Sequence, residues 1–307
     1  MTQDPKEPWR ARVSQPLEVE TVPLLSSVVS LDVAAASTGG RRRTHNTDHY
    51  LAMRFSRVQE TLVTSLAPGD LPPRFEEHAY VMLVADGLGE DAAGARASRV
   101  VLSALASLAI EYGKWNVRIS PDTMADIVQQ GAFFCRRAND AIVRASEEHP
   151  ELANMATSLT ALYIAEEDLF FSHVGHSRGY LFRDGVLTQL TVDHSLDDQR
   201  FAVGRPLPVE GARRDLGHVV IETLGGKASP PDVDIEHLKL SPGDRLLLCT
   251  NGLTDVVGHD QIADALSGRR RPLDECRWLI DLAREAKGED DVTVLVADYS
   301  IRPPMAA

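Results

Sequence analysis

Three apolar segments of the sequence end or begin at side chains that could coordinate a cation. The three segments are Ala85-Asp86-Gly87, Thr250-Asn251-Gly252 and Asp290-Asp291-Val292. An oxygen ligand at the tip of a rigid strand, next to a glycine that lets the backbone approach, is a common way to hold a hard cation. Oxygen donors favour Mg²⁺ or Mn²⁺ over Zn²⁺. Asp-Gly and Asn-Gly are also frequent turn dipeptides, so an ordinary structural role stays open for each segment.

The segment around Gly87 also resembles a nucleotide-binding loop. Gly87-Leu-Gly89-Glu-Asp-Ala92 partly matches the dinucleotide fingerprint G-x-G-x-x-G/A. The charges argue against that function, because Asp86, Glu90 and Asp91 would face the pyrophosphate at the start of the following helix. These acidic side chains favour a cation at this position instead.

Hydrophobic periodicity indicates which elements must position these side chains. Helical spacing predicts helices over 91–111, 120–144, 260–266 and 273–286. A period of two residues predicts an antiparallel meander over 157–191, and apolar runs predict strands over 80–85, 219–224, 245–250 and 292–297. We also expect two short strands between 29 and 55 around a polar turn at 37–48, and loops over 59–77 and 193–217.

The order of these elements predicts an α+β fold. Strands gather in hairpins instead of alternating one-to-one with helices, which favours antiparallel sheets covered by helices over a doubly wound parallel sheet. No linker divides the chain, so we expect one domain over 29–300. We expect an extended or disordered arm at 1–28 and a short tail at 301–307.

The composition argues against several classes of protein. The 307 residues carry a net charge of −13, which repels nucleic acid and anionic lipid. The most apolar run, 100–110, is shorter than the roughly 20 residues of a membrane span, and no signal peptide is apparent. Cys135, Cys249 and Cys276 form no C-x-x-C pair, which fits a reducing cytosol. We therefore expect a cytoplasmic monomer that binds neither nucleic acid nor membrane.

Six groups of short motifs are more specific in their order than any one of them alone. They are Arg43-Thr-His-Asn-Thr-Asp48; Val84-Ala-Asp86-Gly87-Leu-Gly89 with Ala93-Gly-Ala-Arg-Ala-Ser98; Met155-Ala-Thr-Ser-Leu-Thr160; Val174-Gly-His-Ser-Arg-Gly-Tyr-Leu181 with Gln189-Leu-Thr-Val-Asp-His-Ser195; Cys249-Thr-Asn-Gly-Leu-Thr-Asp255; and Asp290-Asp-Val-Thr293. In this order and spacing they resemble the metal-dependent protein serine/threonine phosphatases of the PPM family (type 2C). The resemblance covers nearly the whole chain from residue 29 onward.

This resemblance implies a four-layer α-β-β-α sandwich, in which two antiparallel sheets are flanked by helices and a two-metal site lies at the edge. In that family two Mn²⁺ or Mg²⁺ ions activate a water that attacks the phosphorus of phosphoserine or phosphothreonine. The implied partner is a phosphorylated protein, such as the substrate of a Ser/Thr kinase.

The resemblance also implies roles for individual residues. Asp86 would bridge the two ions, and Arg43 would clamp the substrate phosphate with its planar donor fork. The other implied metal ligands are Asp48, Gly87 through its carbonyl, Asn251 and Asp290.

The chain departs from the family pattern at three positions. Thr47 stands where a glutamate ligand is usual, and Asn251 replaces an aspartate of the first coordination sphere. His176 replaces the aspartate that helps bacterial members hold a third ion, so a third ion is not expected here. Asn251 can still coordinate through its carbonyl oxygen and Thr47 weakly through its hydroxyl, but less negative charge weakens the binding of divalent ions.

Two hypotheses follow from this pattern of retained and altered residues. The first is a protein phosphatase, active or weakly active, that needs elevated Mn²⁺ or Mg²⁺. The alternative is a catalytically weak or inactive phosphatase fold that binds a phosphoprotein or a regulatory partner. In either case, the irregular stretch 196–214 resembles in position the variable flap that borders the substrate groove in this family.

Overall fold

We analysed the fold in a computed structural model of the chain. The structure describes residues 24–41, 44–67, 69–89, 91–114, 117–194, 222–226 and 233–302. The helices are α1 (Leu25–Val28), α2 (Asp91–Tyr112), α3 (Pro121–Glu148), the 3-10 helix η1 (Pro150–Leu152), α6 (Asn251–Thr254), α7 (His259–Ser267) and α8 (Pro272–Glu285). The strands are β1 (Val29–Thr38), β2 (Asp48–Glu60), β3 (Arg74–Leu88), β4 (Ala156–Thr157), β5 (Leu159–Ala165), β6 (Asp168–Val174), β7 (Arg178–Arg183), β8 (Val186–Gln189), β9 (Leu224–Gly225), β10 (Asp234–Lys239), β11 (Arg245–Cys249) and β12 (Val292–Ile301).

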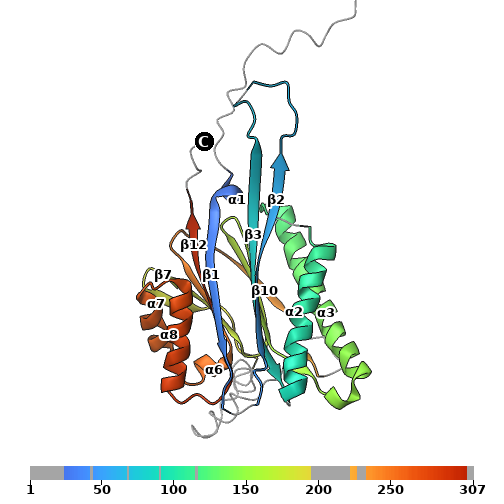
Figure 1. The fold of residues 1–307 in the computed structure, drawn as a ribbon, viewed down its shortest axis with the longest axis vertical. Coiled ribbons are helices and arrows are strands. Elements are labelled where there is room, and N and C mark those ends of the chain that lie inside the picture. The colour runs from blue at the N-terminus through green and yellow to red at the C-terminus, as the bar shows by residue number, and fades with distance from the viewer. Residues whose placement is uncertain are drawn as a thin grey trace, which may run out of the picture.

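The strands form two antiparallel sheets packed face to face (Figure 1). The strand order of one sheet is β1-β12-β11-β7-β8. The other has the order β10-β6-β5-β3-β4-β9, and β2 also pairs with β3. Helices α7 and α8 lie outside the first sheet, and α2 and α3 lie outside the second (Figure 1). The α+β class and the α-β-β-α layers expected from the sequence are therefore confirmed.

The alternation of side chains along the strands divides the core into layers. On β3, Met82 and Val84 pack between the two sheets, whereas Leu83 and Ala85 pack under α2 and α3. Strand β11 alternates in the same way between the inter-sheet layer and the layer under α7 and α8. Because both faces of these strands are buried, their sequences are continuous apolar runs.

Helix α3 shows the local signals that the sequence analysis used. It begins at Pro121, and Ser120 and Thr123 cap it reciprocally: the Thr123 amide donates to Ser120 Oγ, and the Ser120 amide donates to Thr123 Oγ1. Such a capping box satisfies amides that the first turn of a helix leaves without partners. The predicted helix over 120–144 is confirmed and extends to Glu148.

The predicted loop over 59–77 is wrong at both ends. Strand β2 continues to Glu60 and β3 starts at Arg74, and these two residues face each other in the register. Arg74 also forms ion pairs with Glu60 and Glu76 on this exposed end of the hairpin. Charged side chains on both strands remove the apolar alternation by which a strand is recognised in a sequence.

The two ends of the second sheet, at β10 and β9, differ from the prediction. Of the predicted strand over 219–224, residues 219–221 lie outside the described residues, and Leu224 belongs to β9, which continues to Gly225; most of the predicted loop 193–217 also lies outside the described residues. Strand β10, which pairs with β6, was not predicted at all. Part of the predicted arm, Leu25–Val28, is a helical turn, and Ser26 within it donates a hydrogen bond to Glu77.

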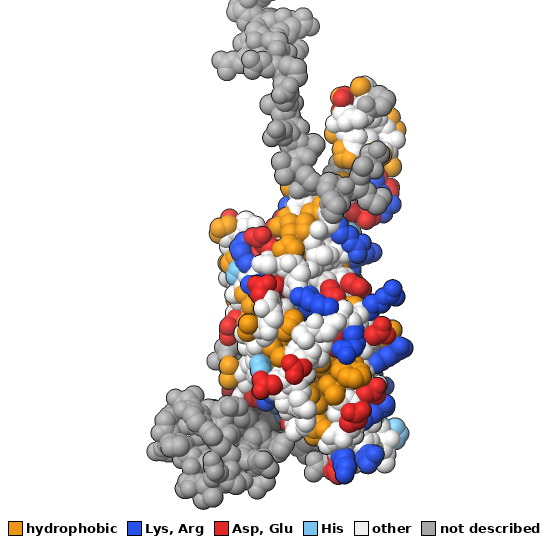
Figure 2. All heavy atoms as spheres, turned by 90° about the vertical axis from the view of Figure 1, so that its left-hand side faces the viewer, with side chains coloured by type: hydrophobic (Ala, Val, Ile, Leu, Met, Phe, Trp, Pro, Cys, Tyr) orange, Lys and Arg blue, Asp and Glu red, His pale blue; other side chains and the backbone are white. Residues whose placement is uncertain are grey.

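Helix α2 is the one described helix that is long and apolar enough to cross a membrane, over Ala92–Tyr112. In the structure this helix packs on β3 and α3, which accounts for its apolar composition without a membrane. The opposite outer layer is charged: Figure 2 shows acidic and basic side chains intermingled on this side of the molecule. On α8 the pairs Arg277–Asp274 and Arg284–Asp281 lie 3.9 and 3.6 Å apart.

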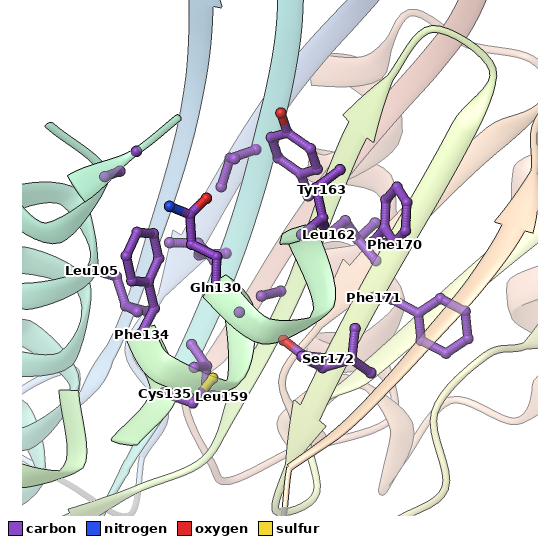
Figure 3. Close-up of a pocket in the computed structure, with 18 of the residues that line it drawn as sticks. Leu105, Gln130, Phe134, Cys135, Leu159, Leu162, Tyr163, Phe170, Phe171 and Ser172 are labelled. Carbon is purple, nitrogen blue, oxygen red and sulfur yellow. The ribbon is translucent and has the colours of Figure 1, made fainter. Parts of the chain in front are cut away.

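A cavity of about 150 Å³ lies between α3 and the second sheet (Figure 3). Its lining is largely apolar and aromatic, including Phe134, Tyr163 and Phe170, with Gln130 and Ser172 as polar members. Cys135 also lines it, and like the other two cysteines it is free and buried. None of its lining residues is charged, so the cavity offers no donor set for a cation and no cationic partner for a phosphate.

Candidate metal centre

The acidic motifs meet at the edge of the sandwich where strands of both sheets end, in the lower part of Figure 1. Strand β2 begins at Asp48 and β3 ends at Leu88 in one sheet, while β11 ends at Cys249 and β12 begins at Val292 in the other. A hydrogen bond joins the two sheets here, because Thr250 Oγ1 donates to Asp48 Oδ2 over 2.8 Å. The fold thus places the ends of four strands from different parts of the sequence around one site.

Asp48 and Asp86 are the two carboxylates at the centre of this edge. They face each other in the antiparallel register of β2 and β3, and each is 5% exposed. Burial, followed by the charge of Asp86, raises the pKa of the Asp48 carboxyl well above its ordinary value, against a smaller opposing effect of the Thr250 hydroxyl. Asp48 Oδ1 is buried and has no hydrogen-bond partner.

Two residues form hydrogen bonds with the main chain of Asp86: Thr157 on β4 and Ser158 directly after that strand. The Asp86 carbonyl accepts hydrogen bonds from Thr157 Oγ1 at 2.8 Å and from the Ser158 amide at 2.9 Å. In return, the Asp86 amide donates to Ser158 Oγ at 3.3 Å. The motif Met155–Thr160 therefore positions the carboxylate without being a ligand itself.

Glycine is required beside two of the predicted ligands, Asp86 and Asn251, because backbones approach closely there. A Cβ on Gly87 would lie 2.1 Å from the carbonyl oxygen of Gly94 on α2. A Cβ on Gly252 would lie 2.0 Å from the carbonyl oxygen of Asp291. These contacts pack α2 against β3 and α6 against the start of β12, and they explain why Asp-Gly and Asn-Gly occur here as more than turn dipeptides.

Asp291 has a structural role that the sequence analysis did not assign. One carboxylate oxygen accepts from the Gly40 amide at 2.8 Å, and the other accepts from the Thr47 amide at 2.8 Å and the Thr47 hydroxyl at 3.0 Å. The proton of the Thr47 hydroxyl is therefore used on Asp291, and weak coordination through its oxygen stays a prediction. The only signal in the sequence was the position of Asp291 directly after Asp290.

The remaining predicted ligands lie at the rim of the same edge. Asn251 begins α6, and its side-chain nitrogen Nδ2 donates to Asp255 Oδ2 at 3.0 Å. Asp290 is half-buried, and its Oδ1 accepts from the amide of Asp291 at 3.0 Å. Arg43, predicted to clamp the substrate phosphate, lies outside the described residues, as does the predicted flap over 196–214.

His176 lies in the link between β6 of one sheet and β7 of the other. Its Nδ1 is 3.6 Å from Asp86 Oδ2. Burial lowers the pKa of His176, although the charges of Asp255, Asp193 and Asp290 act in the opposite direction. The histidine that replaces a family aspartate therefore still points into the acidic edge.

The next residue, Ser177, completes a sequence Gly175-His-Ser-Arg-Gly179 that has the form of a nucleophile elbow, G-x-S-x-G. Ser177 is fully buried, and its hydroxyl hydrogen-bonds with those of Ser158 and Thr160. A serine without access to substrate cannot act as a nucleophile, so this motif is structural.

The donor set at this edge fits a divalent cation bound through oxygen. Two facing buried carboxylates repel each other, and a cation would remove that repulsion and occupy the unpartnered Oδ1 of Asp48. In the described part of the chain, no three His, Cys, Asp or Glu side chains are already arranged around one point.

Comparisons with known proteins agree with this geometry. Residues 74–285 match the family model described as protein phosphatase 2C. The chain is 35% identical over 220 residues to the serine/threonine protein phosphatase PstP of Mycobacterium tuberculosis, a match that covers 72% of this chain and 40% of that protein. This chain therefore matches less than half the length of that relative.

Solved structures extend the similarity to the whole described fold. The crystal structure of the M. tuberculosis phosphatase PstP/Ppp matches with a TM-score of 0.70 and 31% identity, over 88% of this chain and 99% of that one. The catalytic domain of PstP in complex with two manganese ions matches with a TM-score of 0.67 and 32% identity, over 89% of this chain and 99% of that one. With its sheet sandwich, its acidic edge and a family match over most of its length, this chain is a member of the protein phosphatase 2C (PPM) family.

Proposed function

We propose that this protein hydrolyses phosphoserine and phosphothreonine in proteins and depends on Mn²⁺ or Mg²⁺. The observation that carries the proposal is the pair of buried carboxylates, Asp48 and Asp86, facing each other where the family motifs meet. The matched relative is named a serine/threonine protein phosphatase, and its catalytic domain has been solved with two manganese ions. Two ions are proposed for this chain as well.

Each residue of the edge has a task in this proposal. Asp48 and Asp86 hold the ions, and Asn251, Asp290 and the carbonyl of Gly87 supply further oxygen donors. When bound, the ions would lower the pKa of a water and offset the negative charge of the phosphoryl group. The hydrogen bonds from Thr157 and Ser158 fix the main chain of Asp86, so that the carboxylate stays at the same place through turnover. Arg43 is proposed to bind the substrate phosphate.

The proposed affinity for metal is low, because the chain has fewer anionic donors than the family pattern. Thr47 donates its hydroxyl to Asp291, and Asn251 brings no charge. Fewer carboxylates in a site mean weaker binding of a divalent ion. The activity is therefore proposed to need elevated Mn²⁺ or Mg²⁺.

The proposed setting is cytoplasmic signalling, in which a monomer acts on a phosphoprotein made by a Ser/Thr kinase. The net charge of −13 disfavours binding to nucleic acid or anionic lipid. The apolar helix α2 is accounted for by packing on β3 and α3, which supports the proposal that the protein does not enter a membrane.

Hydrolysis of p-nitrophenyl phosphate and of a phosphothreonine peptide across a Mn²⁺ titration tests this function. We expect metal-dependent turnover of both substrates, with loss of turnover in Asp86→Asn. Asp264→Asn, which changes an exposed carboxylate on α7, is the matched control and should keep full activity. Full hydrolysis in Asp86→Asn would refute the proposed site.

The alternative, a phosphatase fold that only binds a phosphoprotein or regulatory partner, makes a different prediction for the same titration. It expects no turnover of either substrate at any Mn²⁺ concentration, in a protein that is folded. The donor set at the edge favours the enzyme, because a pure binding module has no need of two buried, mutually repelling carboxylates.

A further inference from the structure

The imidazole of His176 is a buried polar group that the fold leaves unsatisfied. Its Nδ1 is shielded from solvent and has no hydrogen-bond partner, and its side chain is 9% exposed. A buried polar atom without a partner costs free energy, and most such atoms in native proteins are bonded. The hydrogen bonds of the fold therefore do not explain why this nitrogen is directed into the edge.

The main chain holds this imidazole in place. Gly175 before it has a φ of +105°, and a Cβ there would lie 2.5 Å from the Cβ of Ser158, so the chain must turn tightly at this point. Arg178 after it forms a bidentate pair with Asp193, with nitrogen to oxygen distances of 2.9 and 2.7 Å. Because these contacts fix both Gly175 and Arg178, His176 lies in a rigid link between the two sheets.

His176 and Asp86 lie slightly farther apart than two ligands of one metal ion would. Nδ1 and Asp86 Oδ2 are 3.6 Å apart. Nitrogen and oxygen ligands at about 2.0–2.2 Å from one metal lie roughly 3.0–3.4 Å from each other in octahedral or tetrahedral geometry. A movement of a few tenths of an ångström would therefore let both donors bind the same cation.

The chemistry of this pair differs from that of an all-oxygen site. Carboxylate, carbonyl and water ligands suit Mg²⁺ and Mn²⁺, whereas imidazole suits later transition metals such as Fe²⁺ and Zn²⁺. A site that exchanges a carboxylate for an imidazole loses negative charge and gains a nitrogen donor, whose affinity for divalent transition metals rises from Mn²⁺ through Fe²⁺ to Co²⁺.

We propose that His176 coordinates a metal ion through Nδ1 beside Asp86, and that this ligand makes the centre selective for divalent transition metals over Mg²⁺. The inference rests on the proposed metal dependence and deepens it, because it names the residue that decides which metal serves.

Electron spin echo modulation of the Mn²⁺-loaded full-length protein tests this directly, since nitrogen bound to Mn²⁺ modulates the echo. We expect a ¹⁴N modulation in the wild type that is replaced by a ¹⁵N pattern when the protein is made with ¹⁵N-histidine. The modulation should vanish in His176→Asp and persist in His78→Gln. His78 is the matched control because it lies eight residues from Asp86 on β3, roughly 26 Å at about 3.3 Å per residue.

Calorimetric titration with Mg²⁺ and with Mn²⁺ gives the selectivity. We expect the ratio of the Mg²⁺ and Mn²⁺ dissociation constants to fall about tenfold in His176→Asp, because an oxygen donor replaces a nitrogen donor. His176→Asn, which carries no charge and no imidazole, should lose the nitrogen signal as well, so the result does not depend on one variant folding.

The outcomes separate this inference from the proposed function. Turnover by a Mn²⁺-loaded protein that shows no histidine nitrogen signal, or a signal that survives in both His176 variants, would overturn the role of His176 and leave the phosphatase standing. A nitrogen signal that depends on His176 in a protein without turnover would support the metal ligand and refute the phosphatase. A wild-type protein that binds no Mn²⁺ would overturn both.

Discussion

Asp48 and Asp86 lie directly opposite each other across the β2–β3 pair, buried at the edge where both sheets end. Like charges at such a cross-strand position destabilise a sheet. The hydroxyl of Thr250 offsets part of this cost at Asp48, but the pKa of Asp48 still rises well above its ordinary value. Other interactions of the fold must therefore offset this repulsion in the metal-free protein, and binding of a cation at the pair would raise the stability of the protein.

The first prediction concerns metal removal. A folded-state pKa above the unfolded value means that the folded protein holds the proton of Asp48 more tightly, so this stabilisation is present at low pH and is lost as the pH rises through the folded value. At neutral pH, Asp48→Asn should therefore raise the melting temperature of the EDTA-treated protein, by about 2–4 °C for each 1 kcal/mol of relieved repulsion. The same variant should lose most of the stabilisation that Mn²⁺ gives the wild type.

Differential scanning calorimetry with EDTA and with Mn²⁺ measures both effects. Asp264→Asn on the exposed face of α7 is the control and should behave as the wild type under both conditions. An Asp48→Asn protein that melts earlier than the wild type in EDTA would show that the carboxylate pair does not repel as described.

A second prediction is that Asn251→Asp strengthens metal binding. The substitution adds one anionic oxygen donor at the rim, and the affinity of oxygen sites rises with the number of charged ligands. We expect the Mn²⁺ concentration that gives half-maximal hydrolysis to fall about tenfold. In the metal-free protein the variant should be less stable, because the hydrogen bond to Asp255 Oδ2 becomes a contact between two carboxylates. An unchanged Mn²⁺ titration would place residue 251 outside the site.

In contrast, we predict that Thr47→Glu does not restore a ligand. Thr47 is fully buried and donates both its amide and its hydroxyl to Asp291, so a glutamate would bring a second buried charge next to the first. We expect a loss of about 3 kcal/mol or more in the free energy of unfolding, the usual cost of an uncompensated buried charge. Urea unfolding measures it, with Thr47→Ser as the control that keeps the hydroxyl. A stable Thr47→Glu protein with tighter Mn²⁺ binding would contradict this role of Thr47.

The close approach of β3 and α2 leads to a prediction for Gly87→Ala. The new Cβ would lie 2.1 Å from the Gly94 carbonyl oxygen and 2.8 Å from that of Thr47, and both are backbone atoms that cannot yield cheaply. We expect a destabilisation of about 1–3 kcal/mol or more, together with weaker Mn²⁺ binding. Gly258→Ala, whose Cβ would meet its nearest atom at 3.6 Å, should destabilise less, because the cost of alanine at this N-cap of α7, up to about 1 kcal/mol, is partly offset by a less flexible unfolded chain. Equal stabilities of the two variants would be evidence against the tight packing.

The last prediction concerns acid. Burial, with the positive charges of His194 and Arg178 as further contributions, lowers the pKa of His173 from 6.5 to about 3. A histidine whose folded-state pKa lies below its unfolded value destabilises the fold as the pH falls from about 6.5 toward 3. The contribution of His173 to the slope of the unfolding free energy against pH approaches one proton, or about 1.4 kcal/mol per pH unit.

Unfolding by urea at several pH values across that window measures this slope. His173→Gln retains polar atoms that can bond to Thr160 and Gly175 but does not titrate. We expect its stability to fall less steeply with acid than that of the wild type. The same slope in both proteins would assign the acid sensitivity to other groups.

Much of the fold was already determined by local sequence. The apolar runs of β3, β11 and β12 and the helical spacing of α2 and α3 carry their periodicity within a few residues, and the order of the motifs identified the family. Predictions went wrong where that periodicity is overlaid by charge, as at the ends of β2 and β3, and they missed β10, which pairs with the distant β6. There, pairing with a neighbouring strand decides the structure, and a neighbour distant in sequence leaves no local pattern.

The candidate site divides in the same way. The residue types and spacing of the strand-end motifs by themselves indicated an oxygen-rich cation site around Asp86, Asn251 and Asp290, and the resemblance to the family added Asp48. Only the tertiary structure decided that Thr47 is bound to Asp291 and that the Nδ1 of His176 is left without a partner beside Asp86. The physical reason is that residue type determines which interactions a side chain can make, whereas the folding of distant segments onto one edge determines which of them are made.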